Sequence, residues 1–415
     1  MKMEHRLGNA AVDVEKFSKL GTQDLQNNQP QRALESFKYS YKRSKELDDG
    51  YTERACAFNL GAVYIALGEF RKGVDTLEKS VPPENKREGR SNGDLYFNFG
   101  VGYEGLGNNE EAVRNYKRAL DEYKVERDNV QMEAECLEKL AQIYIKMHNQ
   151  FAAETFGQLA AAYEILNNAV KQMWALSEKA SQLFVKGQTE EAESTADECL
   201  QLSSKCDSNA NIGNLYNDLG LIYTQMTKYD KAVSCFEQAL PLVKNVGDMK
   251  QEAVVLQNLG ATFNFLAEFD KAVQYHQQAA DLYAKLRNRN SQGQCFANLA
   301  FAHSQLGNIE EAGEAFLHAF QAAKDTGDRR TQWQVCEGLG AVAFTQKNYT
   351  KAIEYFKKAL GFLAAADSSN SPAQDRIVAK LTKALEIQAL GSIQAKIGVH
   401  KEVCFNTKYM EDSVK

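Results

Sequence analysis

The chain repeats itself at intervals of 39 to 41 residues, and this period constrains its fold more than any other feature. The repeat is marked by the second member of a Leu-Gly or Leu-Ala pair, or of a degenerate copy, at Gly21, Gly61, Gly100, Ala141, Ala180, Gly220, Gly260, Ala300 and Gly340. Twelve residues after each marker stands a small residue, at Ala33, Gly73, Ala112, Ala153, Ala192, Ala232, Ala272, Ala312 and Ala352. Because this register never slips, the chain is expected to consist of nine copies of one structural unit.

Each repeat has the spacing of two short helices. Four residues beyond most of the small residues comes a large apolar one, at Phe37, Leu77, Tyr116, Phe236, Phe316 and Phe356. Positions four apart share one face of a helix, so the pattern predicts a packed second helix. Gly68, Gly107 and Gly307 would end the first helix, and Asp248 and Asp328 would begin the next repeat. A two-helix unit cannot bury its apolar stripe alone, so the units are expected to stack around one continuous core.

The pattern LG-x-x-Y followed at a fixed offset by A-x-x-x-F-x-x-A resembles the tetratricopeptide repeat, and it covers roughly residues 13–365. The period is longer than the common 34 residues and is similar to the variant found in rapsyn and in the Leu-Gly-Asn repeat adaptors of spindle orientation. The resemblance implies an all-α, right-handed superhelical solenoid of about nine helix-turn-helix repeats. Its binding partners would then be proteins held in a concave groove.

The sequence outside the repeats predicts the remaining organisation. We expect an N-terminal extension over 1–12, nine repeats over 13–365 with degenerate units near 130–205, a linker and capping helix over 366–397, and a flexible tail over 398–415. Pro82 and Pro83 would end a helix and begin an irregular, locally basic connector over 84–93. The covering face of the capping helix is expected to contain Ile377, Val378, Leu381, Leu385, Ile387 and Leu390.

The best candidates for a functional site are polar residues just before the Leu-Gly pair. This position holds Asn59, Asn98, Asn258 and Asn298, with Asp218 in a fifth repeat, and the preceding position holds Phe58, Phe97, Asn217 and Gln257. In several tetratricopeptide families, including the O-linked N-acetylglucosamine transferases, Asn at this site forms a ladder that pairs with the backbone of a bound extended peptide. An amide is suited to this because it both donates and accepts hydrogen bonds. The alternative is that each Asn caps or bridges neighbouring helices.

Composition and motifs disfavour other classes of function. Net charge is −6 and no long basic cluster occurs, so nucleic acid is not an expected partner. No apolar run is long enough for membrane insertion and no secretory signal is evident, so we expect a cytoplasmic protein. The eight cysteines form no CxxC pair and several fall at packing positions, which favours core roles over metal binding or disulfides. No catalytic or phosphate-binding motif is present, so we expect no enzyme activity, no catalytic residues, no cofactor, no metal and no small-molecule substrate.

These observations favour a scaffold or adaptor that binds a partner peptide or helix in the concave groove. Two alternatives remain. One is a regulatory signalling adaptor of the spindle-orientation type, for which no G-protein-binding segment is visible after the repeats. The other is a non-catalytic subunit of an enzyme complex.

Overall fold

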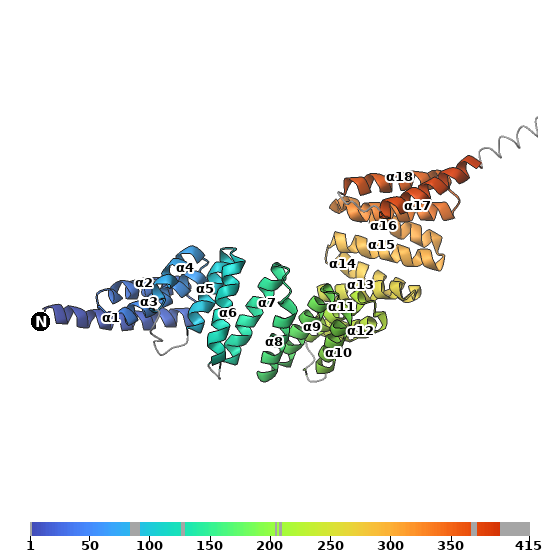
Figure 1. Cartoon of the computed structure of the whole chain (residues 1–415). Helices are drawn as coiled ribbons and strands as arrows, with labels where there is room; N and C mark the ends of the chain where they lie inside the picture. The colour runs from blue at the N-terminus through green and yellow to red at the C-terminus, as the bar shows by residue number, and fades with distance from the viewer. Residues whose placement is uncertain are drawn as a thin grey trace, which may run out of the picture. The chain divides into compact units, whose positions relative to one another are not determined.

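The computed structural model describes residues 2–83, 92–125, 129–203, 206, 210–366 and 372–390. Within these ranges every regular element is a helix, so the predicted all-α class is confirmed. The chain divides into two compact units, Met1–Cys206 and Asp207–Lys415. In each unit the helices form antiparallel hairpins stacked in chain order (Figure 1).

The first unit contains five hairpins. Their helices are α1 (Lys2–Gln26), α2 (Pro30–Ser44), α3 (Gly50–Ala66), α4 (Phe70–Leu77), α5 (Gly93–Gly105), α6 (Asn109–Val125), α7 (Val130–Lys146), α8 (Ala152–Ile165), α9 (Ala169–Val185) and α10 (Thr189–Leu202). A short 3₁₀ helix, η1 (Glu78–Ser80), follows α4. The helix α1 begins at Lys2 and therefore runs through residues 2–12, the stretch expected as an extension of the first repeat.

The second unit contains four hairpins and one further helix. The hairpins consist of α11 (Ala210–Gln225), α12 (Tyr229–Val246), α13 (Met249–Phe265), α14 (Phe269–Lys285), α15 (Arg289–Leu306), α16 (Ile309–Thr326), α17 (Arg329–Thr345) and α18 (Tyr349–Ala365). The further helix spans residues 372–390. Successive first helices of this unit also contact each other, in the pairs α11–α13, α13–α15 and α15–α17. The first helices therefore form one continuous face of the unit.

The repeat markers lie where the two helices of a hairpin cross. All nine markers and all nine small residues twelve positions later are buried. A Cβ atom added to Gly220 would lie 2.5 Å from the Phe236 ring, and one added to Gly340 would lie 2.5 Å from the Phe356 ring. Such separations are well inside van der Waals contact, so the ring of the second helix occupies the space that a marker side chain would need.

In two degenerate repeats, the side chains at the hairpin crossing differ in size from those of the other repeats. Ala141 and Ala180 replace the marker glycine, and the residues sixteen positions later are the small Gly157 and Ala196 instead of a large ring. Ala180 and Ala196 are both fully buried, and Phe156 fills the neighbouring space at 1% exposure. In these two repeats an alanine marker occurs with a small residue in place of the ring, so they depart from the motif without leaving the fold.

The predicted helix ends are confirmed. Gly68, Gly107 and Gly307 adopt left-handed backbone with φ of 77°, 75° and 81°, the conformation that favours glycine at a helix C-terminus. The Asp248 side chain accepts hydrogen bonds from the backbone N–H groups of Lys250 and Gln251 and caps α13. Other hairpins make the same left-handed turn without glycine, at Asn28, His148, Thr227, Ala267 and Lys347. Asn167 and Arg287 adopt it in the turns between successive hairpins.

The helix over residues 372–390 packs on the last hairpin through part of the expected face, since Ile377 is buried and Leu381 packs against the same cluster. Ala373, Ile377 and Ala384 are buried against a cluster that includes Trp333 and Phe356. In contrast, Val378, Leu385 and Leu390 are 41%, 42% and 60% exposed. The assignment of these three residues to the covering face was wrong, and Ala373 and Ala384 are buried there instead.

Two ion pairs join this helix to Glu337 on α17. Arg376 donates to both carboxylate oxygens of Glu337 at 2.8 Å, and Lys380 Nζ lies 2.7 Å from Glu337 Oε1. Burial by itself raises the pKa of Glu337, but the hydrogen bonds from these two cations outweigh it and hold the pKa below its usual value.

Some expectations fall outside the described residues. These are the basic connector over 84–91, part of the linker over 367–371, the end of the predicted capping segment over 391–397 and the tail over 398–415. Gly93, which was expected to belong to the connector, is instead the first residue of α5.

Candidate functional site

The first helices carry all of the predicted site residues. Phe58 and Asn59 lie on α3, Asn98 on α5, Asn217 and Asp218 on α11, Asn258 on α13 and Asn298 on α15. These residues do not behave alike. The structure brings some of them into a pocket, pairs others with each other, and turns one back onto its own helix.

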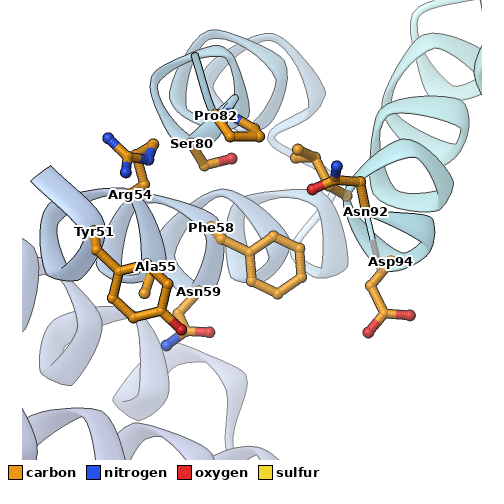
Figure 2. A pocket seen from close by; sticks show the side chains of 10 residues that line it. Tyr51, Arg54, Ala55, Phe58, Asn59, Ser80, Pro82, Asn92 and Asp94 are labelled. Atoms are coloured by element: carbon orange, nitrogen blue, oxygen red, sulfur yellow. The ribbon is translucent and has the colours of Figure 1, made fainter. Parts of the chain in front are cut away.

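In the first unit, Phe58 and Asn59 line a pocket of about 220 Å³ between α3 and α5. Figure 2 shows their side chains on α3, with Asn92 and Asp94 facing them from the start of α5. Tyr51, Arg54, Ala55, Ser80, Pro82, Asn92, Asp94 and Leu95 complete the lining. The pocket thus combines aromatic rings with amides and charged groups, which are the types of side chain that a peptide segment contacts.

Hydrogen bonds beside this pocket fix Asp94, which lines it from α5. The Tyr123 hydroxyl on α6 donates to Asp94 Oδ1 at 2.7 Å, and burial is the main cause of the raised pKa of that phenol. Asn98 Nδ2 donates to the Asp94 backbone oxygen at 2.8 Å, one turn earlier on α5. The Asn98 amide therefore already has a partner within its own helix, whereas the Asn59 amide has none among the described residues.

In the second unit, two predicted residues form a bridge between neighbouring first helices. Asn258 Nδ2 donates to Asn217 Oδ1 at 2.8 Å, which joins α13 to α11. Asn217 is only 7% exposed, so this hydrogen bond also satisfies a buried amide. Here the helix-bridging role applies, although the Asn258 oxygen is left available.

Asp218 is an exposed carboxylate at the end of this bridge. Asn217 Nδ2 lies 3.5 Å from Asp218 Oδ1. Although the Asp218 side chain keeps accessible surface, loss of water around it raises the pKa of the carboxyl, and the contact with Asn217 opposes that effect. No Lys, Arg or His forms an ion pair with Asp218 in the part of the chain that the structure describes.

Asn298 presents a half-buried amide with no side-chain partner among the described residues. Its backbone oxygen accepts a hydrogen bond from Asn264 Nδ2 at 3.4 Å. Asn264 Nδ2 also lies 3.2 Å from Nε2 of the fully buried His276, whose pKa burial lowers to about 4. This pair was missed by sequence reasoning, although His276 occupies the ring position of its repeat.

Sequence reasoning also missed two exposed aromatic pairs beside these amides. Phe265 stacks on Tyr229 with ring centroids 5.1 Å apart, and Phe301 meets the edge of Phe269 at 6.1 Å. Phe265 lies seven residues after Asn258 and Phe301 lies three after Asn298, so each shares a helix face with its amide. This spacing in the sequence could have been used to predict the aromatic pairs.

The cysteines that the structure describes lie mostly in the core. Six of the seven described cysteines are buried, and burial raises the pKa of Cys136 and of Cys295 to about 12. Their thiols therefore remain protonated near neutral pH. Over the described ranges, His, Cys, Asp and Glu side chains form no group of three placed to hold a metal ion.

No described helix is both long and apolar enough to cross a membrane. Family models described as tetratricopeptide repeats match residues 93–124, 171–245, 211–285 and 294–365. The matched stretches follow the repeat period in both units.

Solved structures share this arrangement at low sequence identity. The apo form of RapI covers 86% of this chain and 99% of its own length, with a TM-score of 0.54 and 14% identity. A signal transduction ATPase with numerous domains and a tetratricopeptide repeat sensor, from Pyrococcus horikoshii, gives a TM-score of 0.53 and 18% identity. That match covers 82% of this chain and 53% of the Pyrococcus protein. Both similarities concern the fold.

Proposed function

We propose that this chain, which carries tetratricopeptide repeats, is a scaffold or adaptor. It binds a segment of a partner protein along the faces of its first helices. The observation that carries the proposal is the pocket between α3 and α5. Phe58 and Asn59 were selected from their place in the repeat, and they line the same open pocket. The partner class is protein, with no nucleic acid, membrane insertion or small-molecule substrate, and the proposed setting is cytoplasmic.

A closer relationship is part of the proposal. Residues 55–61, 215–221 and 333–340 are similar to tetratricopeptide repeat protein 24. This similarity implies a fold and little about mechanism.

The first test selects peptides that bind the full chain. A displayed library of random twelve-residue peptides is panned against the protein, and the affinity of selected peptides is measured by fluorescence anisotropy. Peptides that occupy the pocket should lose about tenfold or more in affinity for the Phe58→Ala, Asn59→Ala double variant, because a buried aromatic anchor often dominates binding. Phe151→Ala, which removes a 44% exposed ring elsewhere in the same unit, is the control.

The same selected peptides are then tested on the Asn258→Ala, Asn298→Ala double variant, with helicity checked by circular dichroism. Peptides held by the second unit should bind more weakly while helicity is retained. Failure of the library to yield any saturable binder, or full retention of affinity by both double variants, would contradict the proposal.

A further inference from the structure

A row of polar side chains in the second unit runs from α13 to α11 and ends at a carboxylate. Asn258 Nδ2 on α13 donates to Asn217 Oδ1 on α11 at 2.8 Å. Asn217 Nδ2 in turn lies 3.5 Å from Asp218 Oδ1. Asn217 is only 7% exposed, whereas Asp218 is exposed. We call these three side chains the amide row, and its accessible end is the Asp218 carboxylate.

The carboxylate fixes the direction of the amide row. An ionised carboxylate only accepts hydrogen bonds, so the Asn217 group that faces Asp218 must be the amide nitrogen. The Asn217 oxygen then faces Asn258, which must present its own nitrogen. The opposite assignment of the Asn217 amide would bring two acceptors together. The amide nitrogens that face a neighbour are therefore used within the row, and the Asp218 carboxylate and Asn258 Oδ1 remain as acceptors.

The charge of Asp218 stands alone on its own helix. Asp218 is the only charged residue of α11, and residues 253–265 of α13 contain no Asp, Glu, Lys or Arg. Loss of surrounding water raises the pKa of the Asp218 carboxyl and the contact with Asn217 lowers it, while no charged side chain among the described residues contributes to the shift. The carboxylate is thus partly dehydrated and has no counter-charge.

The lysines at the start of the adjoining second helices are engaged elsewhere. Lys231 on α12 lies with its Nζ 5.4 Å from the centre of the Tyr223 ring. Lys271 on α14 pairs with Glu268 at 2.6 Å. These cations therefore do not neutralise Asp218, and its counter-charge is left to a binding partner.

An apolar side chain beside the carboxylate restricts the type of cation. Leu221 lies three residues after Asp218 on the same helix face and is 38% exposed. The guanidinium group of arginine is planar and weakly hydrated, and its aliphatic stem packs on apolar surface, whereas the ammonium group of lysine is strongly hydrated. A calcium ion would need six to eight oxygen ligands, and this surface offers one carboxylate and one amide oxygen.

We propose that Asp218, held by the amide row and flanked by Leu221, binds the guanidinium group of an arginine in a segment of the partner protein. Asn258 Oδ1 is available to accept an N–H group of the same segment. This inference rests on the proposed function and specifies the partner of the second unit.

The chemistry of the carboxylate favours arginine over other side chains. A neutral or acidic side chain placed here would remove more water from Asp218 without supplying a positive charge. Arginine donates two parallel hydrogen bonds to a carboxylate, so it satisfies both oxygens while it neutralises the charge. The pair would therefore set which segments bind this unit.

The first experiment asks whether Asp218 selects arginine. The random twelve-residue library is depleted on the Asp218→Asn variant and then panned against the full chain. Depletion removes peptides that bind elsewhere, including those that occupy the pocket between α3 and α5. Peptides recovered from the full chain should be enriched in arginine at least about threefold over the starting library.

A double-mutant cycle then connects the two charges. One recovered peptide is prepared with arginine, with citrulline, which keeps the shape without the charge, and with lysine. Fluorescence anisotropy should show about tenfold weaker binding of the citrulline form to the parent chain. The same change should have no effect on binding to Asp218→Asn, because the partner charge is already absent. The lysine form should bind the parent chain about threefold more weakly than the arginine form.

Glu314→Gln is the matched control. It exchanges an exposed carboxylate for an amide on α16, a second helix of the same unit. Affinity for the arginine peptide should change by about twofold at most. Circular dichroism and the melting temperature are recorded for every variant, and Asp218→Asn should retain both because its carboxylate has no ion pair to lose.

The inference would be overturned if the depleted library gave no arginine-enriched binders, or if the arginine and citrulline forms bound the parent chain equally. Equal losses on the citrulline change in the parent chain and in Asp218→Asn would also overturn it, as would equal or tighter binding of the lysine form. These results leave the proposed function standing if peptides selected without depletion still bind through Phe58 and Asn59. Absence of any peptide binding would remove both.

Discussion

At the residue scale, the fold depends on positions occupied by glycine as much as on those with large side chains. Gly220 and Gly361 are both helical glycines, but only the first faces a ring. A methyl group on Gly220 would lie 2.5 Å from Phe236, whereas one on Gly361 would meet no atom within 4 Å. Substitutions at these two positions therefore distinguish the effect of packing on stability from the effect of helix propensity.

Alanine substitution should act with opposite signs at these two positions. Gly220→Ala should lower the free energy of unfolding by about 1–3 kcal/mol through overpacking. Gly361→Ala should raise it by up to about 1 kcal/mol, because alanine favours the helix. Chemical denaturation of the full chain measures both, and a stabilising Gly220→Ala would show that the assigned hairpin crossing is incorrect.

His276 should make stability depend on pH. Its pKa is about 4 in the folded chain and about 6.5 when exposed, so the unfolded state binds a proton more readily as pH falls. Stability should therefore decline from neutral pH towards pH 4. His276→Phe, which restores the ring found at Phe236 and Phe356, should remove about 2 kcal/mol of the loss between pH 7 and pH 5.

The measurement is a series of denaturant titrations at pH 7, 6 and 5 for both proteins. Parallel pH profiles would show that His276 is not held neutral by burial.

Some residues at this scale were predictable and others were not. The markers and their small partners were readable because every repeat obeys the same spacing. The bond between Asn258 and Asn217 depends on the rotation of one repeat against the next, which a single repeat pattern does not contain. The left-handed turn at Thr227, with φ of 59°, was hidden because a β-branched residue occupies the usual glycine position.

At the scale of elements, the helix over 372–390 follows its apolar pattern only in part, because Ile377 and Leu381 pack on the last hairpin and other members do not. Apolar spacing placed Val378, Leu385 and Leu390 on the covering face, yet all three are exposed. Helix periodicity identified the element and two residues of its packed face, but it did not identify Ala373 and Ala384. Ion pairs also join this helix to α17, where the 10% exposed side chain of Glu337 pairs with Arg376 and Lys380.

Glu337→Gln should loosen this helix without unfolding the hairpins. Loss of charge-assisted hydrogen bonds should lower the local opening free energy of residues 372–390 by about 1.5–3 kcal/mol. Hydrogen exchange followed by mass spectrometry would show faster exchange confined to this helix and the adjoining surface of α17. Lys383→Ala, which removes only a cation 5.9 Å from the Phe344 ring, should have a smaller effect.

Equal exchange rates in the Glu337→Gln variant and the parent chain would mean that apolar packing through Ile377 and Ala384 alone holds the helix.

At the scale of the whole molecule, the nine hairpins among the described residues provide many similar surfaces, and the candidate site lies where the repeats differ. Phe58 and Asn59 face a pocket, Asn98 bonds its own helix, and Asn217 and Asn258 bond each other. Repeat position alone therefore identifies which helices carry a binding face. It does not identify which amides are free, because that depends on each neighbouring repeat.

The account rests on the claim that partners bind the first helix of each hairpin. The most direct measurement is hydrogen exchange of the full chain with and without a peptide selected from the random library. The account predicts slower exchange in α3 and α5, or in α11, α13 and α15, with the second helices α4 and α14 changing less. Protection confined to second helices, or to the helix over 372–390, would contradict it.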